Sequence, residues 1–271
     1  MDLETEYNNR RRVPGHPAII AGWEADAAHF RDAAGGELGL AYGPDARHRC
    51  DIFRSKEDHG GAHAVFIHGG YWQGLDRAFF SHLARGLEFH GIPMALPSYR
   101  LCPAVAVADI IADLQRFCLW LWQRSGRRLV VAGHSAGGHL AACMAATDWT
   151  ALGGPARLVT AGLGISGLYD LRPLIPTTIN AALKLDDKAA RQASPLTWPA
   201  PHGVRFQAWV GAAESPEYLR QSASLEAAWR GAGLDCASVI AEGENHFTIV
   251  AALAQPDSAL TRALATLCDA A

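Results

Sequence analysis

The stretch from Leu129 to Met144, LVVAGHSAGGHLAACM, constrains the fold of this chain more than any other segment. It begins as an apolar, β-branched run, turns sharply at GHSAG (133–137) and continues with the spacing of a helix. A strand, a Gly-x-Ser-x-Gly turn and a helix in this order predict a nucleophile elbow, in which small neighbours permit a strained serine above the strand end. Ser135 is therefore the candidate nucleophile. The alternative is a Gly-rich turn around a buried serine.

Two places in the sequence offer backbone N–H groups for a developing negative charge. Ala136 follows the serine at the predicted helix N-terminus, where the helix dipole favours an anion. His68-Gly69-Gly70 follows a short apolar strand, and its two glycines let the backbone approach a substrate closely. We expect Gly69, Gly70 and Ala136 to form an oxyanion hole. The alternative for residues 69–70 is an ordinary Gly-Gly turn.

Strand and helix patterns alternate along most of the chain. Two short runs around a Gly-Pro-Asp turn predict a β-hairpin at a sheet edge, at Leu38–Tyr42 and His48–Phe53. Further strands are predicted at Ala62–Ile67, Ile92–Leu96, Leu129–Val131, Arg157–Ile165, Val204–Val210 and Leu234–Ile240, and helices at Ile19–Phe30, Ala104–Trp122, Pro216–Arg230 and His246–Leu267. Phe79, Leu83 and Leu87 also have helical spacing. This alternation predicts a mostly parallel sheet with helices on both faces and a ligand site beyond the carboxyl ends of its strands.

The length of 271 residues suits one domain, 1–271, with two segments outside the regular alternation. Residues 1–36 form a polar and amphipathic leader, in which Pro14 and Pro17 are expected to prevent a helix before Ala18. Residues 170–202 are rich in proline, with a short helical piece near 179–185, and are expected to lie over the site as a cap.

A serine hydroxyl is a weak nucleophile unless a base removes its proton, and histidine is the usual base. His246 lies in a polar loop after the last predicted strand, where we expect it to open the final helix and to reach Ser135. The alternative role for His246 is to cap that helix at the surface. His202, in the proline-rich segment, is a weaker candidate for the base.

In a fold with this Gly-x-Ser-x-Gly elbow, the acid lies between the serine and the histidine along the chain and is expected to follow the strand before that of the histidine. Glu214 is the first carboxylate after the strand predicted at 204–210, and Pro216 begins the next helix. Glu214 could therefore fix the tautomer of His246 and stabilise its imidazolium form. Glu217 is the competing candidate, although its place in the first helical turn also suits a residue that only interacts with the helix dipole.

The composition excludes several classes of function. The chain has 24 Lys and Arg against 27 Asp and Glu, so we expect no nucleic-acid or membrane partner, and a small-molecule substrate instead. The polar N-terminus lacks the apolar core of a signal peptide, and six scattered cysteines suit a reducing compartment, which together predict a cytoplasmic protein. Twelve histidines show no metal-ligand spacing, so no metal is expected. Whether the chain forms a homodimer stays open.

With these residues identified, the sequence resembles the α/β-hydrolase superfamily, in its esterase/lipase branch with an HGG oxyanion loop. More narrowly, it is similar to the kynurenine formamidase (arylformamidase) group. The motifs that carry the resemblance are YNNR (7–10), HGGYW (68–72), SYRL (98–101), GHSAGGHL (133–140), GLYDL (167–171), SPL (194–196) and ESPEY (214–218), with RQS at 220–222. One departure is Glu214, where members of the group often carry aspartate.

The resemblance implies acyl transfer to water without a cofactor, by a catalytic triad of Ser135, Glu214 and His246. Tyr71 and Trp72 follow the oxyanion glycines and are expected to line the substrate pocket, and Leu174, Ile175 and Ile179 add an apolar cap. A small acyl group on an aryl amide or ester, with N-formylkynurenine as the best candidate, fits this set. The alternatives are a carboxylesterase or thioesterase for short-chain esters, or a non-catalytic ligand-binding protein of the same fold.

Overall fold

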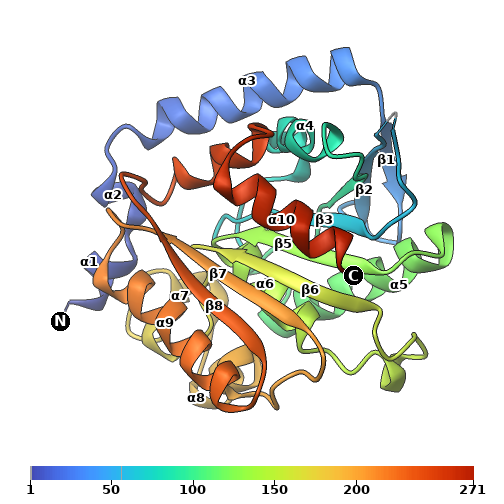
Figure 1. Ribbon diagram of the computed structural model, residues 1–271. Coiled ribbons are helices and arrows are strands. Elements are labelled where there is room, and N and C mark those ends of the chain that lie inside the picture. Colours follow the sequence, from blue (N-terminus) through green and yellow to red (C-terminus); the bar gives the residue numbers. More distant parts are fainter. Residues whose placement is uncertain (1, 56) are drawn as a thin grey trace.

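An eight-stranded sheet runs through the centre of the molecule (Figure 1), in a computed structural model that describes residues 2–55 and 57–271. The strands are β1 (Glu37–Ala41), β2 (Arg49–Phe53), β3 (His63–Ile67), β4 (Met94–Pro97), β5 (Leu129–His134), β6 (Val159–Ile165), β7 (Arg205–Gly211) and β8 (Asp235–Ala241). Their order is β1-β2-β4-β3-β5-β6-β7-β8. The β1–β2 hairpin at the edge and the β2–β4 pair are antiparallel, and the other pairs are parallel. The prediction of a mostly parallel sheet is confirmed.

Helices cover both faces of this sheet, because neighbouring side chains of a strand point to opposite faces and both sets are apolar. In β3, Val65 and Ile67 join one buried cluster, while Ala64 and Phe66 join the other. The first cluster packs under α5 (Val107–Ser125), α6 (Ala136–Ala145) and α9 (Pro216–Gly231), and the second under α3 (His16–Ala34), α4 (Ala84–Glu88) and α10 (Ala259–Asp269) (Figure 1). Over residues 2–55 and 57–271, no helix is long and apolar enough to cross a membrane.

Several predicted helix boundaries are wrong, each for a local reason. His246 does not open the last helix: the 246–267 region divides into a 3₁₀ segment, Ile249–Ala254, and α10, with Pro256 between them. Proline cannot donate the N–H that a continuous helix needs. The helix over Phe79–Leu87 is likewise replaced by two 3₁₀ turns, Arg77–Phe79 and Ser81–Leu83, followed by α4.

The leader is also more helical than expected. Two short helices, α1 (Leu3–Tyr7) and α2 (Asn9–Arg12), precede Pro14. Helix α3 begins at His16, before Ala18, because Pro17 lies in its first turn, where the missing N–H costs nothing.

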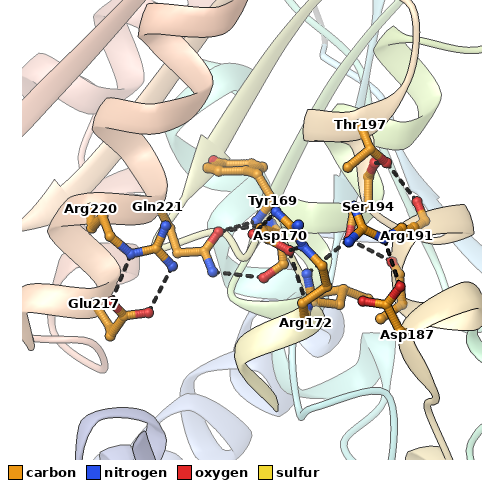
Figure 2. Close-up of polar contacts among 12 residues, drawn as sticks. Tyr169, Asp170, Arg172, Asp187, Arg191, Ser194, Thr197, Glu217, Arg220 and Gln221 are labelled. Atoms are coloured by element: carbon orange, nitrogen blue, oxygen red, sulfur yellow. Dashed lines mark hydrogen bonds and ion pairs between the residues drawn. The ribbon is translucent and has the colours of Figure 1, made fainter. Parts of the chain in front are cut away.

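The 170–202 segment holds two short helices, α7 (Asn180–Leu183) and α8 (Asp187–Gln192), between 3₁₀ turns. Its start is anchored on α9 by one side chain, as Figure 2 shows: Gln221 Oε1 accepts hydrogen bonds from the N–H groups of Tyr169 and Asp170, both at 2.8 Å. Gln221 Nε2 donates to the carbonyl oxygen of Asp170 at 2.8 Å, and Arg172 forms an ion pair with the Asp170 carboxylate. The base of this segment is therefore fixed to the main domain.

The turn between β5 and α6 has the geometry of a nucleophile elbow. Ser135 adopts φ +58° and ψ −120°, a conformation that costs energy for a residue other than glycine. A Cβ atom on Gly137 would lie 1.9 Å from the carbonyl oxygen of Ile67, and one on Gly133 would lie 2.1 Å from that of Gly137. Only glycine at these positions lets the start of α6 approach the strands so closely.

We therefore expect Gly137→Ala to destabilise the protein by at least about 3 kcal/mol or to prevent folding, because backbone would have to move. Gly22→Ala is the matched control: Gly22 lies inside α3 with no atom near the new Cβ, so the change should stabilise by about 0.5–1 kcal/mol. Urea unfolding followed by circular dichroism measures both. Equal stability of the two variants would contradict this account of the elbow.

Candidate active site

Three side chains from separate strand ends meet in the structure. Ser135 follows β5, Glu214 follows β7, and His246 follows β8. His246 Nε2 lies 3.1 Å from Ser135 Oγ, and His246 Nδ1 lies 2.7 Å from Glu214 Oε2. Because a carboxylate can only accept, it fixes the proton on Nδ1 and leaves Nε2 free to accept from the serine hydroxyl. The arrangement can thus remove a proton from Ser135.

Glu214 is held in place by groups from two strand ends. Its Oε1 atom accepts a hydrogen bond from Ser166 Oγ at 2.6 Å and from the N–H of Gly211 at 2.8 Å. Ser166 directly follows β6 and adopts φ +52°, so its hydroxyl is placed by an unusual backbone conformation. Ser166 is not among the predicted site residues, and its place directly after a predicted strand is the only sequence feature that indicates it.

Glu217 serves a different purpose. Its carboxylate accepts from Arg220 Nε and Nη2 at 2.7 and 2.8 Å and from the Tyr7 hydroxyl at 2.6 Å (Figure 2 shows the Arg220 pair). The Arg220 guanidinium lowers the pKa of Glu217. The structure therefore brings Glu214, and not Glu217, to His246.

The backbone of His246 is held by a second histidine. His134 Nε2 donates to the carbonyl oxygen of His246 at 2.7 Å, and burial lowers the pKa of His134 to about 3. The Tyr218 ring lies 4.8 Å from the His246 ring, measured between centroids. The place of His134 as the second residue of the GHSAG motif is the only sequence feature that indicates it.

The loop that contains Gly69 and Gly70 lies against the elbow. A Cβ atom on Gly69 would lie 2.8 Å from the carbonyl oxygen of His134 and 3.0 Å from Ser135 Cβ. Gly70 has φ +106° and would clash with Gly74 if it had a side chain. Over the described residues, the N–H groups of Gly69, Gly70 and Ala136 donate to no other group of the protein. Donors are thus available beside Ser135 for an oxyanion.

The expectation that Trp72 lines the pocket is wrong. Trp72 is fully buried, and its Nε1 donates to His139 Nδ1 on α6 at 3.3 Å. The reason is a backbone turn with positive φ at both Tyr71 and Trp72, which sends the indole under the loop. Tyr71 does line the cavity, while its hydroxyl donates to the carbonyl oxygen of Tyr7 and contacts the Tyr218 hydroxyl at 2.7 Å.

A cavity of about 430 Å³ opens beside Ser135 and His246. This volume lies within the range of about 300–1,000 Å³ that small-molecule sites occupy. The leader supplies much of its wall, and the cap only two residues. The lining residues are Glu4, Tyr7, Asn8, Asn9, Arg10, Ile20, Trp23, Gly70, Tyr71, Gln73, Gly74, Leu75, His134, Ser135, Thr178, Ile179, His246 and Phe247. Of the expected apolar cap residues only Ile179 reaches the cavity, because Leu174 is buried in the core and Ile175 packs against it.

Buried hydrogen bonds fasten the leader over this cavity. Tyr7 is fully buried, donates to Glu217 and accepts from Gln221 Nε2 at 2.9 Å, and burial raises its pKa above the usual range of tyrosine. Asn9 Nδ2 donates to the Tyr218 hydroxyl at 2.8 Å. Glu4 accepts from the N–H and the hydroxyl of Thr178, both at 2.7 Å. Glu4 and residues 7–10 of the leader are therefore part of the site.

A family profile of the alpha/beta hydrolase fold matches residues 64–249. The chain belongs to this family. Among residues 2–55 and 57–271, no group of three or more His, Cys, Asp or Glu is placed to hold a metal ion.

Relatives of this hydrolase extend over nearly the whole chain. The kynurenine formamidase of Danio rerio is 26% identical and covers 97% of this chain and 94% of its own length. That of Drosophila melanogaster is 29% identical, with 83% and 79% covered. A crystal structure from Silicibacter sp. TM1040, described as a candidate thioesterase, is 35% identical, covers 99% of both chains and has a TM-score of 0.89. The family match and these relatives show that the chain is a hydrolase of the α/β fold.

Buried neutral histidines around the site predict its response to acid. Burial lowers the pKa of His134 to about 3 and that of His68 and His139 to about 4. In the unfolded chain their pKa is near 6.5, so below that pH the unfolded state binds more protons than the folded state.

We therefore expect these histidines to leave the free energy of unfolding unchanged above pH 6.5. Between pH 6.5 and 5 the free energy of unfolding should fall, by up to about 1.4 kcal/mol per pH unit for each such histidine. Urea titrations at pH 7.5, 6.5, 5.5 and 5.0 measure this slope. His202→Gln, at an exposed position, should leave it unchanged. A flat profile over this window would show that these histidines are not buried in neutral form.

Proposed function

We propose that this hydrolase cleaves a small acyl group from an aryl amide or ester, with Ser135 as nucleophile, His246 as general base and Glu214 as the acid that orients it. The observation that carries the proposal is the continuous hydrogen-bonded series from Glu214 through His246 to Ser135, at 2.7 and 3.1 Å. Each of these groups is at most 5% exposed, so water competes little with their hydrogen bonds.

The reaction proceeds in two acyl-transfer steps. Ser135 Oγ attacks the carbonyl carbon while His246 Nε2 takes its proton, and the carbonyl oxygen becomes an oxyanion. The N–H groups of Gly69, Gly70 and Ala136 stabilise that charge. His246 then gives its proton to the leaving amine or alcohol, and the acyl group stays on Ser135. In the second step His246 removes a proton from water, whose oxygen attacks the acyl carbon. His246 then returns the proton to Ser135 Oγ as the bond between Oγ and the acyl carbon breaks and the carboxylic acid leaves.

N-formylkynurenine is the proposed substrate. The relatives from D. rerio and D. melanogaster named kynurenine formamidase support it, since they cover most of this chain. The cavity also supports it: its volume of about 430 Å³ suits a compact molecule, and Tyr71, Trp23 and Phe247 offer aromatic surface for an aryl ring.

A carboxylesterase or thioesterase for short-chain esters is the second candidate. The structure described as a candidate thioesterase is 35% identical over the whole chain and favours it. The machinery proposed above would serve such esters equally well. For either substrate we propose a cytoplasmic location and a small-molecule partner; all six cysteines are free and buried, which suits a reducing compartment.

Glu214→Gln should reduce kcat by about four orders of magnitude, close to the effect of Ser135→Ala, because the amide no longer stabilises the imidazolium of His246. Glu217→Gln is the matched control. It weakens the pair with Arg220 and should lower thermal stability, but it should cost far less in kcat. Steady-state kinetics with p-nitrophenyl acetate and thermal melts measure both. If Glu217→Gln proves the more damaging to kcat, the assignment of the acid is wrong.

The substrate proposal is tested by kcat/KM for N-formyl-L-kynurenine beside p-nitrophenyl acetate, butyrate and octanoate. We expect turnover of the formamide and a decline from acetate to octanoate, because the cavity is compact. Ser135→Ala provides the background rate for each substrate. Efficient cleavage of esters with no formamide turnover would favour the esterase alternative. A preference for octanoate would contradict the compact site.

A further inference from the structure

One arginine, Arg10, lines the cavity beside Ser135 and has no ion-pair partner among the described residues. Apart from histidines, the charged side chains that line it are Glu4 and Arg10. The Glu4 carboxylate is occupied by the two hydrogen bonds from Thr178. Over residues 2–55 and 57–271, the Arg10 guanidinium has no ion pair within 4 Å and no hydrogen bond to any other group. Glu4 keeps its negative charge, because the donors on Thr178 are neutral, but its oxygens already have partners. The N–H groups of the exposed Arg10 guanidinium are therefore available to a ligand at the wall of the cavity.

The structure holds Arg10 at this wall through its neighbours. Asn8 caps α2 by accepting from the N–H of Arg11 at 3.1 Å, and the buried Asn9 side chain donates to the Tyr218 hydroxyl at 2.8 Å. Tyr218 in turn lies against the His246 ring. The backbone at residues 8–9 is thus fixed beside the site, and Arg10 is the next residue of the chain. Arg11 and Arg12 do not line the cavity, and Arg12 is paired with Glu6.

We propose that Arg10 binds a carboxylate on the leaving-group part of the substrate and selects for it. A guanidinium presents a planar fork of donors that matches a carboxylate with two parallel hydrogen bonds. This inference rests on the proposed function. A small acyl group such as formyl carries no carboxylate, so the carboxylate must belong to the aryl amine or alcohol that leaves. Arg10 would be a specificity residue, while the chemistry stays with Ser135 and His246.

The test uses an ester pair, so that it does not depend on formamide hydrolysis. The neutral member is phenyl acetate, and the charged member is 3-(2-acetoxyphenyl)propanoate, which carries its carboxylate on the leaving group. The quantity measured is the ratio of kcat/KM for the charged ester to that for the neutral ester. A ratio cancels any general effect of a substitution on folding or on Ser135.

Arg10→Gln should lower this ratio about two- to fivefold, the range expected when one exposed ion pair is lost. Arg11→Gln, which removes the same charge from the same short helix outside the cavity, should leave the ratio unchanged. Added salt should lower the ratio in the unsubstituted protein and much less in Arg10→Gln.

An equal fall of the ratio in both variants would assign the effect to the general charge of α2. An unchanged ratio in Arg10→Gln would remove Arg10 from the site. Either result overturns the proposal.

The same variants are then compared on N-formyl-L-kynurenine and its decarboxylated analogue. If the ester ratio responds to Arg10 but neither formamide is cleaved, the carboxylate site stands and the formamidase function fails. If the unsubstituted protein and Arg10→Gln both cleave the formamides, and each protein cleaves the two formamides equally well, the formamidase function stands and the carboxylate site fails.

Discussion

The close approach of α6 to the end of β3 is the constraint on which the rest of the site depends. Gly137 has room for no side chain beside the carbonyl oxygen of Ile67, and this contact sets where Ser135 and Ala136 lie. The loop with Gly69 and Gly70 begins two residues after Ile67, so the same contact brings it beside the serine. The strained backbone of Ser135 persists because β5 is held between β3 and β6 by complete strand pairing.

Parallel strands then bring the remaining groups to the same edge. Ser135 directly follows β5 and Ser166 directly follows β6, while Glu214 and His246 lie in the loops after β7 and β8. In a parallel sheet the carboxyl ends of neighbouring strands lie side by side, so residues more than a hundred positions apart become neighbours. Hydrogen bonds finish the alignment: Ser166 and Gly211 hold Glu214, and His134 holds the backbone of His246.

The leader and the loops decide the shape of the cavity. Tyr7 and Asn9 lie against Glu217, Gln221 and Tyr218 of α9 through buried hydrogen bonds, and such a network is rigid when each member finds a partner. The same helix anchors the start of the 170–202 segment through Gln221 (Figure 2). One helix thus positions both the leader and the start of the cap segment, and the leader supplies more of the lining residues than the cap does.

The sequence by itself determined the fold class, the elbow and the candidates Ser135, Glu214 and His246, because strand and helix periodicity and the tight Gly-x-Ser-x-Gly turn are local properties. Only the tertiary structure separated Glu214 from Glu217, placed Ser166 and His134 behind the site, buried Trp72 and brought Arg10 into the cavity. These outcomes depend on which distant groups meet. Glu217 lies in the first turn of α9, three residues after Glu214 in the preceding loop, yet its carboxylate faces Arg220 and Tyr7 instead of His246. The position of a side chain in space follows from packing between elements, and no local pattern records that packing.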